Sequence, residues 1–353
     1  MKIVFTGGGT AGHIMPNIAL INSLDASHQV FYLGSNGMEQ KLIPQNTKNV
    51  TYVSIKTAKF KRKLCLSNFV LPFRIISSVA FCKKKLKEIN PDVVFCKGGY
   101  VSLPVAVAAN SLSIPVVVHE SDTTAGLANK LCAKQSFAFL STFELPNQKN
   151  AQRVGCPVRQ QIYDASAQKG LQLMRFDGKK PILLFLGGSL GAERLNALAQ
   201  GVYPHLKRKF DIFVVSGKGK SFAEKEGLHC TEFCNDIFDI IKACAFCVTR
   251  GGANTLCELC VLNLPFIVVP LVNSSRGEQS ANADYFQQHG CGEKASPNVT
   301  ATQLVEQINK LYPKAPLLRQ AQRQLSVDGT RKTLQVIAQA SLSKRKRKIP
   351  TQK

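Results

Sequence analysis

The same pattern of strand, glycine-rich turn and helix occurs twice in this chain. In the first copy an apolar segment at 3–6 leads through four glycines, at 7, 8, 9 and 12, into a helical pattern at 14–24. In the second copy the apolar run at 181–186, PILLFL, leads through a Gly-Gly-Ser-Leu-Gly turn into a helical pattern at 192–200. Such a turn brings backbone N–H groups and a positive helix end close to a phosphate. The repeat therefore predicts two α/β domains, each with its own glycine-rich loop.

The segments between and after the two copies continue the alternation of strands and helices. Further strands are expected at 29–33, 92–96, 115–119, 211–215, 246–249 and 265–269. This alternation indicates parallel, doubly wound sheets, and 353 residues are enough for two such domains. We expect a first domain at 1–158, a second at 159–329, a last helix at about 330–342 that can pack back onto the first domain, and a disordered basic tail at 343–353.

The composition, with 44% hydrophobic and 19% charged residues, is that of a globular protein. No stretch approaches the roughly 18 apolar residues of a spanning helix, and the first ten residues do not follow a signal-peptide pattern. We therefore expect the protein in the cytoplasm, with its 12 cysteines reduced.

Four cysteines have a spacing that suggests a zinc site, namely Cys244, Cys247, Cys257 and Cys260. They lie in apolar segments, however, so we favour small buried thiols as the interpretation. No Asp-x-Asp motif occurs, which makes a metal-bridged diphosphate unfavourable. We expect neither a metal nor a cofactor.

The charge is lopsided, with 46 Lys+Arg against 22 Asp+Glu and a net charge of +24, and it implies an anionic partner or surface. The basic run at 59–63 is followed by apolar residues at three- and four-residue spacing, from Leu66 to Phe81, and then by lysines at 83–85. Such a stretch can lie on an anionic membrane. An ordinary core-facing helix explains the spacing equally well, and we favour the membrane. A nucleic-acid-binding protein is the alternative from another class, but no recognisable binding module is present.

The first glycine loop satisfies the dinucleotide fingerprint, with Gly7-x-Gly9-x-x-Gly12. The match is weak, because no acidic residue stands at 32–34, where the second strand ends, to hold a ribose. Neither loop continues as the Gly-Lys-Ser/Thr of a P-loop. Two such loops in two domains favour a diphosphate donor on one side of a cleft and a phosphorylated acceptor on the other.

Seven short motifs lie in order along nearly the whole chain. They are TGGGTAGH at 6–13, PDVV at 91–94 with GGYVS at 98–102, IPVVVHE at 114–120 with AGLANK at 125–130, GCPVR at 155–159, GGSLG at 187–191, RGGA at 250–253 with Glu258, and EQSAN at 278–282. With these motifs the chain resembles the MurG family of peripheral membrane glycosyltransferases. The resemblance implies an α/β fold of GT-B type, with two Rossmann-like domains facing a cleft.

The resemblance also implies an activity. Members of the family move N-acetylglucosamine from UDP-GlcNAc, with inversion, to undecaprenyl-pyrophosphoryl-MurNAc-pentapeptide in peptidoglycan synthesis. The chain is therefore expected at the cytoplasmic face of the bacterial cell membrane, on an anionic surface and without a nucleic-acid partner. A transferase of the same fold that acts on another lipid-linked acceptor is the alternative.

In the second domain, the resemblance implies the donor contacts. Glu258 matches the carboxylate that accepts hydrogen bonds from the two ribose hydroxyls. Ser189 matches the diphosphate site, and Arg159 matches the arginine that neutralises the leaving UDP. The remaining expected donor contacts are Phe233 and Cys234 beside the uracil, Gln279 and Asn282 at the sugar, and Arg250 in the Arg-Gly-Gly motif.

In the first domain, the resemblance implies an acceptor-side loop of Thr10, Ala11, Gly12 and His13. An inverting transfer needs a base for the proton of the attacking hydroxyl. We expect His13 in this role because it is a histidine at a helix N-terminus; a histidine that only hydrogen-bonds a phosphate is nearly as well supported.

Asp122 is the other candidate base and stands where many relatives carry Asn. His119 and Glu120 end the preceding strand and are expected to orient the site. Two positions depart from relatives that carry polar residues there, Leu190 and Glu278, and each puts one donor contact in doubt.

Overall fold

The computed structural model describes residues 1–57, 71–146, 148–187, 192–271 and 277–348. The chain divides into two compact units. The first consists of Met1–Gln160 and the C-terminal segment from Asp328, and the second consists of Gln161–Val327.

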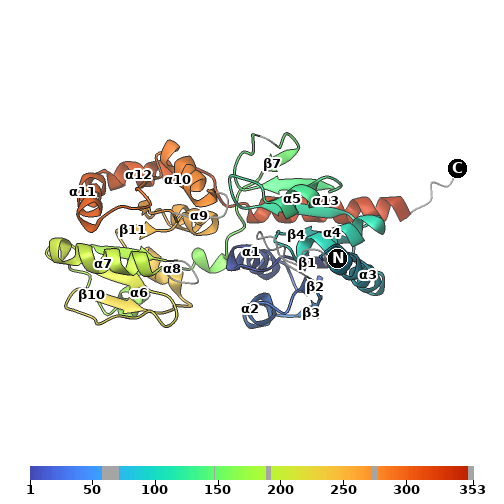
Figure 1. The fold of residues 1–353 in the computed structure, drawn as a ribbon, viewed down its shortest axis with the longest axis horizontal. Coiled ribbons are helices and arrows are strands. Elements are labelled where there is room, and N and C mark those ends of the chain that lie inside the picture. Colours follow the sequence, from blue (N-terminus) through green and yellow to red (C-terminus); the bar gives the residue numbers. More distant parts are fainter. Residues whose placement is uncertain (58–70, 147, 188–191, 272–276, 349–353) are drawn as a thin grey trace. The chain divides into compact units, whose positions relative to one another are not determined.

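The first unit is built on a parallel sheet of seven strands in the order β3-β2-β1-β4-β5-β6-β7 (Figure 1). The strands are β1 (Lys2–Thr6), β2 (Gln29–Gly34), β3 (Val50–Ser54), β4 (Val93–Cys96), β5 (Val116–Glu120), β6 (Ala138–Ser141) and β7 (Ala151–Arg153). The helices are α1 (Ala11–Asn22), α2 (Glu39–Asn46), α3 (Leu71–Ile89), α4 (Ser102–Ser111), α5 (Leu127–Ala133) and α13 (Thr330–Lys348). The strand order reverses between β1 and β4, and open α/β sheets bind ligands at the carboxyl ends of strands at such a point.

The second unit is built on a parallel sheet of six strands in the order β10-β9-β8-β11-β12-β13. The strands are β8 (Ile182–Leu186), β9 (Asp211–Val215), β10 (Leu228–Thr231), β11 (Phe246–Thr249), β12 (Phe266–Val268) and β13 (Gly292–Lys294). The helices are α6 (Ala167–Met174), α7 (Glu193–Leu206), α8 (Ile237–Ala243), α9 (Ala253–Val261), α10 (Glu278–Gln288), α11 (Ala301–Leu311) and α12 (Ala315–Gln324), with short 3-10 turns at Gln160–Ile162 and Tyr312–Lys314. Here the order reverses between β8 and β11, which marks the second expected binding edge.

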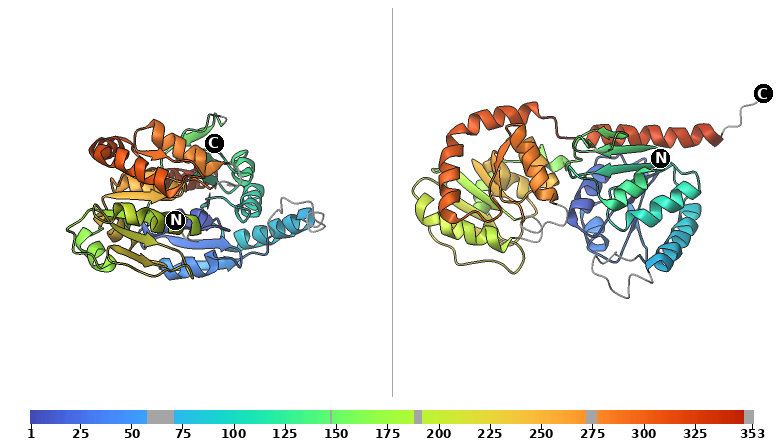
Figure 2. Two further views of the ribbon diagram at one scale, coloured as in Figure 1. Left: turned by 60° about the vertical axis from the view of Figure 1, so that its left-hand side comes forward. Right: turned by 45° about the horizontal axis from the view of Figure 1, so that its top comes forward.

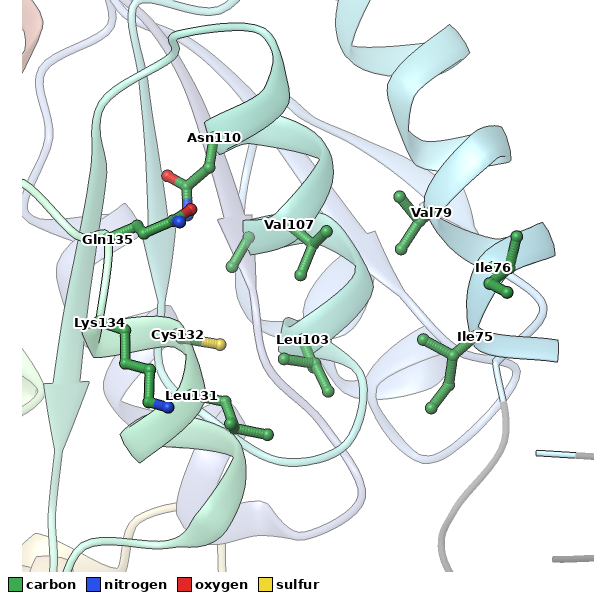
Figure 3. A pocket seen from close by; sticks show the side chains of 11 residues that line it. Ile75, Ile76, Val79, Leu103, Val107, Asn110, Leu131, Cys132, Lys134 and Gln135 are labelled. Atoms are coloured by element: carbon green, nitrogen blue, oxygen red, sulfur yellow. The ribbon is translucent and has the colours of Figure 1, made fainter. Parts of the chain in front are cut away.

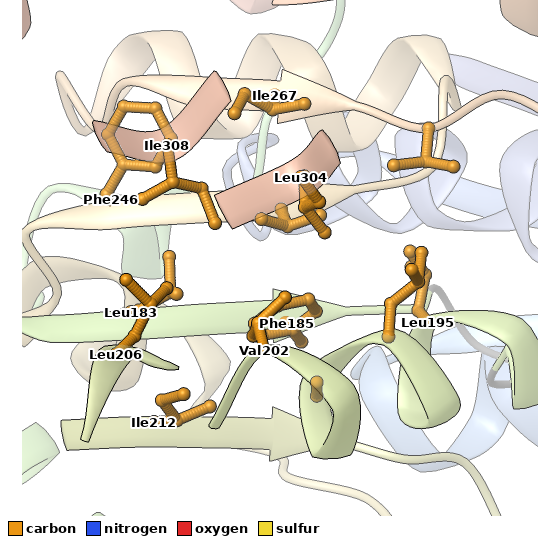
Figure 4. Packing of buried hydrophobic residues seen from close by; sticks show 14 of the residues in the cluster. Leu183, Phe185, Leu195, Val202, Leu206, Ile212, Phe246, Ile267, Leu304 and Ile308 are labelled. Carbon is orange, nitrogen blue, oxygen red and sulfur yellow. The ribbon is translucent and has the colours of Figure 1, made fainter. Parts of the chain in front are cut away.

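Both sheets are covered by apolar side chains on their two faces. In β1, Ile3 and Phe5 join one buried cluster and Val4 joins another, because successive side chains of a strand point to opposite faces. In the second unit, Phe185 of β8 packs with Leu195 of α7 and others in a single cluster (Figure 4). This burial on both faces explains why the strands are continuous apolar runs, and it confirms the expected parallel, doubly wound α/β architecture.

Helix α13 differs from the sequence expectation at its C-terminal end. It continues to Lys348 instead of ending at 342, so the prediction that the tail is disordered from 343 is wrong for 343–348. Within this extension Lys344 is buried, because its ammonium donates to Asn90 Oδ1 at 3.1 Å and to the Pro91 carbonyl. The helix packs beside α1 and against β4 and β5 (red in Figures 1 and 2). Among the helices that the structure describes, none is long and apolar enough to cross a membrane.

Candidate functional site

Two buried polar side chains hold the backbone of the loop after β1. The Tyr32 hydroxyl, buried at the end of β2, donates to the Gly7 carbonyl at 2.6 Å. Asn17 of α1 donates to both the Thr6 carbonyl, at 3.3 Å, and the Tyr32 hydroxyl oxygen, at 3.1 Å. These buried hydrogen bonds to the carbonyls of Thr6 and Gly7 hold the backbone of the loop in one conformation. The loop is therefore shaped before any ligand arrives.

A buried carboxylate, that of Glu39 at the start of α2, lies against the next part of the loop. It accepts hydrogen bonds from the Gly9 N–H at 3.3 Å and from the Ser35 N–H and hydroxyl at 3.0 and 2.5 Å. A Cβ added to Gly8 would overlap this carboxylate, so a larger residue there would displace Glu39. Sequence reasoning looked for an acid at 32–34 and missed Glu39. The signal was present, since Glu39 is an acidic residue in the first turn of the helix that follows β2.

His13 lies in the first turn of α1, half-buried, after Thr10, which is the exposed N-cap residue. Its Nδ1 is 3.0 Å from the Gly8 carbonyl oxygen and 3.1 Å from the Thr10 hydroxyl. A carbonyl oxygen only accepts, so the proton of the neutral ring belongs on Nδ1. Nε2 then carries the lone pair, which is the state that a general base needs. Ala11 and Gly12 stand beside it in the same turn.

The turn after β4 packs directly against the first loop. Gly98 and Gly99 both have positive φ, 116° and 81°, and a Cβ on Gly99 would overlap the Gly8 carbonyl. Gly8 N–H donates to the Gly98 carbonyl at 3.4 Å. Tyr100 lies across Gly9. The two glycine-rich turns therefore interlock at the point where the strand order reverses.

Behind this turn a lysine that sequence reasoning did not select is fully buried. The Lys97 ammonium donates to His119 Nδ1 at 2.9 Å and to the Ser121 hydroxyl at 2.5 Å. The other ring nitrogen of His119, Nε2, donates to the Gly155 carbonyl at 2.9 Å. Burial first, and then the charge of Lys97, hold the pKa of His119 well below its usual range. His119 is thus a neutral side chain that joins β5 to the segment after β7, while its expected role in orienting the site stays a prediction.

Asp122, the alternative base, follows β5 and is half-buried. Glu120 fixes the backbone around it, because its carboxylate accepts from the Ser121, Asp122 and Gly126 N–H groups and from the Asn129 amide. The segments after β1 and β5 are separated by the intervening strand β4. Since neighbouring strands lie about 4.8 Å apart, the strand ends before His13 and Asp122 are about 10 Å apart. Both candidates thus belong to one edge of the first sheet.

In the second unit, Arg250 follows β11 and braces the loop after β12. Its Nη1 donates to the Val269 and Pro270 carbonyls at 2.9 and 3.3 Å. Burial, and then the neighbouring positive charge of Arg194, lower the pKa of Arg250. Sequence reasoning missed Arg194, which lies in the first turn of α7, directly after the second glycine loop. Two cations therefore lie close together at this edge, where an anionic diphosphate is expected.

Two residues of α10 hold the turn that carries Arg250. Asn282 is completely buried and its amide donates to the Gly251 carbonyl at 3.0 Å. The Gln279 side-chain oxygen accepts from the Leu271 N–H at 3.1 Å. The structure thus gives both side chains positioning contacts, while their contact with a donor sugar stays a prediction.

The other expected donor residues lie on different elements of the structure. Glu258 is a half-buried residue of α9, the helix that begins directly after the Arg250 turn. Phe233 follows β10 with its side chain 64% exposed, and Cys234 is half-buried, which raises the pKa of its thiol. Arg159 lies at the end of the first segment of the first unit.

Two expected positions, Ser189 and Leu190, lie outside the residues that the structure describes, whereas Glu278 begins α10. Within the described ranges, no group of three His, Cys, Asp or Glu side chains could hold a metal ion. Cys244, Cys247, Cys257 and Cys260 are all buried.

Comparison with known proteins adds to this geometry. Residues 3–138 match the N-terminal domain of glycosyltransferase family 28, and residues 182–339 match its C-terminal domain. A protein of Lachnospira eligens named UDP-N-acetylglucosamine--N-acetylmuramyl-(pentapeptide) pyrophosphoryl-undecaprenol N-acetylglucosamine transferase is 39% identical over 327 residues, covering 88% of this chain and 91% of that protein. A protein of the same name from Staphylococcus aureus strain MRSA252 is 36% identical over 322 residues, covering 88% and 90%.

Among solved structures, that of MurG from Acinetobacter baumannii matches with a TM-score of 0.77 at 23% identity, covering 96% of this chain and 99% of that chain. This likeness supports the expected GT-B-type fold. The sequence relatives confirm the family that the seven motifs indicated. With both family domains present in order and most of its length matched, the chain belongs to glycosyltransferase family 28.

Proposed function

We propose that this protein transfers N-acetylglucosamine from UDP-GlcNAc, with inversion, to the muramoyl sugar of undecaprenyl-pyrophosphoryl-MurNAc-pentapeptide. The observation that carries the proposal is the 39% identity to a curated transferase of that name over 88% of this chain. The match spans 91% of that protein, so it takes in both domains and not one shared module.

The donor is assigned to the second unit. Glu258, a half-buried residue of α9, would accept hydrogen bonds from the ribose hydroxyls, since a carboxylate offers two acceptor oxygens to two neighbouring donors. Arg250, which follows β11, and Arg194, in the first turn of α7, lie close enough to affect one another and supply positive charge for the diphosphate. Arg159, which belongs to the first unit, is the further cation that the resemblance implies for the leaving UDP. Stabilising the leaving diphosphate in this way lowers the barrier without a metal ion.

The acceptor is assigned to the first unit, with His13 as the base. Its Nδ1–H donates to Gly8, so Nε2 can take the proton of the attacking hydroxyl. As that oxygen bonds to the anomeric carbon, the bond from this carbon to the UDP oxygen breaks and its electron pair leaves with UDP. Asp122 is the alternative proton acceptor on the same edge.

Contact with a membrane is supported by an apolar surface of the first unit. A groove of about 520 Å³ lies between α3, α4 and α5 and is lined by Ile75, Ile76, Val79, Leu103, Ala106, Val107, Asn110, Leu131, Cys132, Lys134 and Gln135 (Figure 3). Large apolar side chains around it are exposed, with Phe73 at 72% and Ile76 at 66%. The predicted basic run at 59–63 and the residues Leu66, Phe69 and Val70 lie outside the described residues.

Exposed basic side chains lie on the same helices as this apolar surface and directly after α5. Arg74, Lys84 and Lys87 of α3, Lys130 of α5 and Lys134 beside it are exposed. Apolar residues that enter the interface, ringed by cations that meet anionic headgroups, are typical of peripheral membrane binding. We therefore propose that the protein acts at the cytoplasmic face of the membrane, where its lipid-linked acceptor lies. An anionic membrane would account for the net charge of +24. We therefore expect no nucleic-acid partner.

The test is transfer of radiolabelled GlcNAc from UDP-GlcNAc to a short-chain analogue of the lipid-linked muramoyl-pentapeptide, in the presence of EDTA. The variants are His13→Ala and Asp122→Asn, with His205→Ala, an exposed histidine of α7, as the control. Product from the native chain and from the control, but not from His13→Ala, supports the proposal. If the native chain binds UDP-GlcNAc and forms no product, the acceptor assignment is wrong. If Asp122→Asn alone is inactive, the base is Asp122.

A further inference from the structure

We propose that Glu39 is a positioning residue for His13 and acts on it through one peptide group, that between Gly8 and Gly9. This rests on the proposed function, in which His13 takes the proton of the acceptor hydroxyl. Glu39 touches no reacting atom in this scheme. It sets the orientation of the histidine and stabilises the charge that the ring acquires.

The two hydrogen bonds belong to the two ends of a single peptide unit. The Gly9 N–H donates to Glu39 Oε2 at 3.3 Å. The carbonyl of the same unit, that of Gly8, accepts from His13 Nδ1 at 3.0 Å. A carboxylate, one peptide and an imidazole therefore form a chain in which every donor meets an acceptor. Because Nδ1 is held at the end of this chain, Nε2 is left as the basic nitrogen.

The peptide unit is closely packed on both sides. A side chain on Gly8 would overlap the Glu39 carboxylate, and one on Gly99 would overlap the Gly8 carbonyl oxygen. Gly9 has φ of +84°, and Tyr100 packs over it. The glycines at these positions thus have a second purpose besides approach to a phosphate, because they let the carboxylate and the peptide come into contact.

The chain of bonds does for His13 what a directly bonded carboxylate does in a serine-protease triad, with a peptide inserted between the two. A negative charge at the N–H end polarises the peptide, which makes the carbonyl oxygen a stronger acceptor. The bond to Nδ1–H strengthens as the ring takes a proton on Nε2 and becomes positive, and the carboxylate itself keeps no proton. The proton of the acceptor hydroxyl therefore ends on Nε2. The charge of Glu39 stabilises the protonated ring through the peptide and its two hydrogen bonds.

Few other charges face this peptide among the described residues. Tyr32 and Tyr52 come from β2 and β3, and burial raises the pKa of both phenols far above its ordinary value, with Glu39 adding to the rise. Both phenols are therefore neutral at working pH. Lys97 of the β4–α4 segment contacts Gly7 through its stem, while its ammonium bonds His119 and Ser121.

The decisive variant is Glu39→Gln, which keeps the size of the side chain and removes the charge. If its oxygen stays on the Ser35 side, its amide NH₂ faces the Gly9 N–H and that bond is lost. A directly paired charge shifts a pKa by about 1 to 3 units, and a charge behind one peptide should act more weakly. We expect the acid limb of the pH profile of kcat/KM to move to lower pH by roughly half a unit to one unit. On the plateau, kcat/KM should fall roughly three- to ten-fold.

A control and a second variant separate this effect from a loosened fold. Tyr52→Phe removes a hydrogen bond to the Ser35 carbonyl in the same network but leaves the charge of Glu39, so its acid limb should not move. Ser35→Ala removes a donor from Glu39, which makes the carboxylate a stronger acceptor for Gly9, so its limb should move in the opposite direction, to higher pH. The melting temperature reports whether each variant is folded, and UDP-GlcNAc binding, which is assigned to the second unit, reports whether the donor site is unaffected.

The outcomes distinguish the inference from the function on which it rests. If Glu39→Gln and Tyr52→Phe give the same unshifted limb, Glu39 is only a structural residue and the inference is overturned. If His13→Gln keeps both transfer and the limb, the base assignment itself is wrong. If His13→Gln removes the limb and Glu39→Gln has no further effect in the His13→Gln background, the two residues act as one unit, as we infer.

Discussion

The membrane proposal makes a quantitative prediction for two side chains of α3. Phe73 and Ile76 are 72% and 66% exposed, so most of each apolar surface is available to enter a lipid interface. Full burial of such a side chain stabilises by about 1.5 to 3 kcal/mol, so this exposed part is worth about 1 to 2 kcal/mol each. Replacing both by serine should therefore weaken binding to vesicles roughly 30- to 700-fold.

The assay is co-sedimentation with vesicles that contain an anionic phospholipid, combined with transfer assays. The double variant should sediment far less, and it should lose transfer to a long-chain acceptor in vesicles while keeping transfer to a water-soluble, short-chain acceptor. Leu317→Ser is the matched control, because Leu317 is 66% exposed on α12 of the second unit. Unchanged sedimentation of the double variant, or an equal loss in Leu317→Ser, would refute the reasoning that this surface of the first unit meets the membrane.

Three further predictions concern the sites themselves. Glu258→Gln should weaken UDP binding roughly 10- to 150-fold, since hydrogen bonds to a charged group contribute about 1.5 to 3 kcal/mol; calorimetry with UDP measures this, and unchanged affinity would remove Glu258 from the donor site. Gly251→Ala should destabilise the second unit by about 1 to 3 kcal/mol, because its Cβ would overlap the Gln279 backbone carbonyl; a melting temperature equal to that of the native chain would show that α10 gives way. For His119, the pKa is lower in the folded than in the unfolded chain, so its contribution to stability is complete above the unfolded value of about 6.5 and is lost as pH falls below it toward the folded pKa. Urea titrations from pH 7.5 to 5 should show this loss, and His119→Gln should reduce the slope; an equal slope in both chains would assign the pH dependence to other groups.

The two glycine loops and the parallel sheets follow from local sequence, because buried strands and glycine turns have distinct patterns. The contact of Glu39 with the first loop could not be predicted from local sequence. Glu39 lies in the first turn of α2, where an acid after β2 can be recognised in the sequence. The sequence does not show, however, that this carboxylate is buried and accepts from Gly9. Its partner becomes visible only when β1 and β2 lie side by side.

The misplaced end of α13 has a similar cause. A run of lysines and arginines is usually solvated, and the sequence prediction treated all of it so. Lys344 is an exception because the Asn90 side-chain oxygen and the Pro91 carbonyl, both distant in sequence, accept hydrogen bonds from its ammonium. For Asn282, the motif indicated the neighbourhood of the sugar but not the direction of the side chain, which tertiary packing turned toward Gly251.

The return of the chain to its first unit has a consequence for synthesis. The second unit is an insertion, entered at Gln161 and left at Val327, and α13 contributes Val336, Ile337 and Ala340 to the same buried cluster as Ile3. On the ribosome, β1 through β7 therefore emerge long before the helix that completes their core. The inserted unit has all of its residues available first and can fold while the earlier one is still incomplete. The last residues to be translated thus complete the unit that was begun first. A ribosome that stalls before 330 therefore leaves the first unit, and not the second, without its last helix.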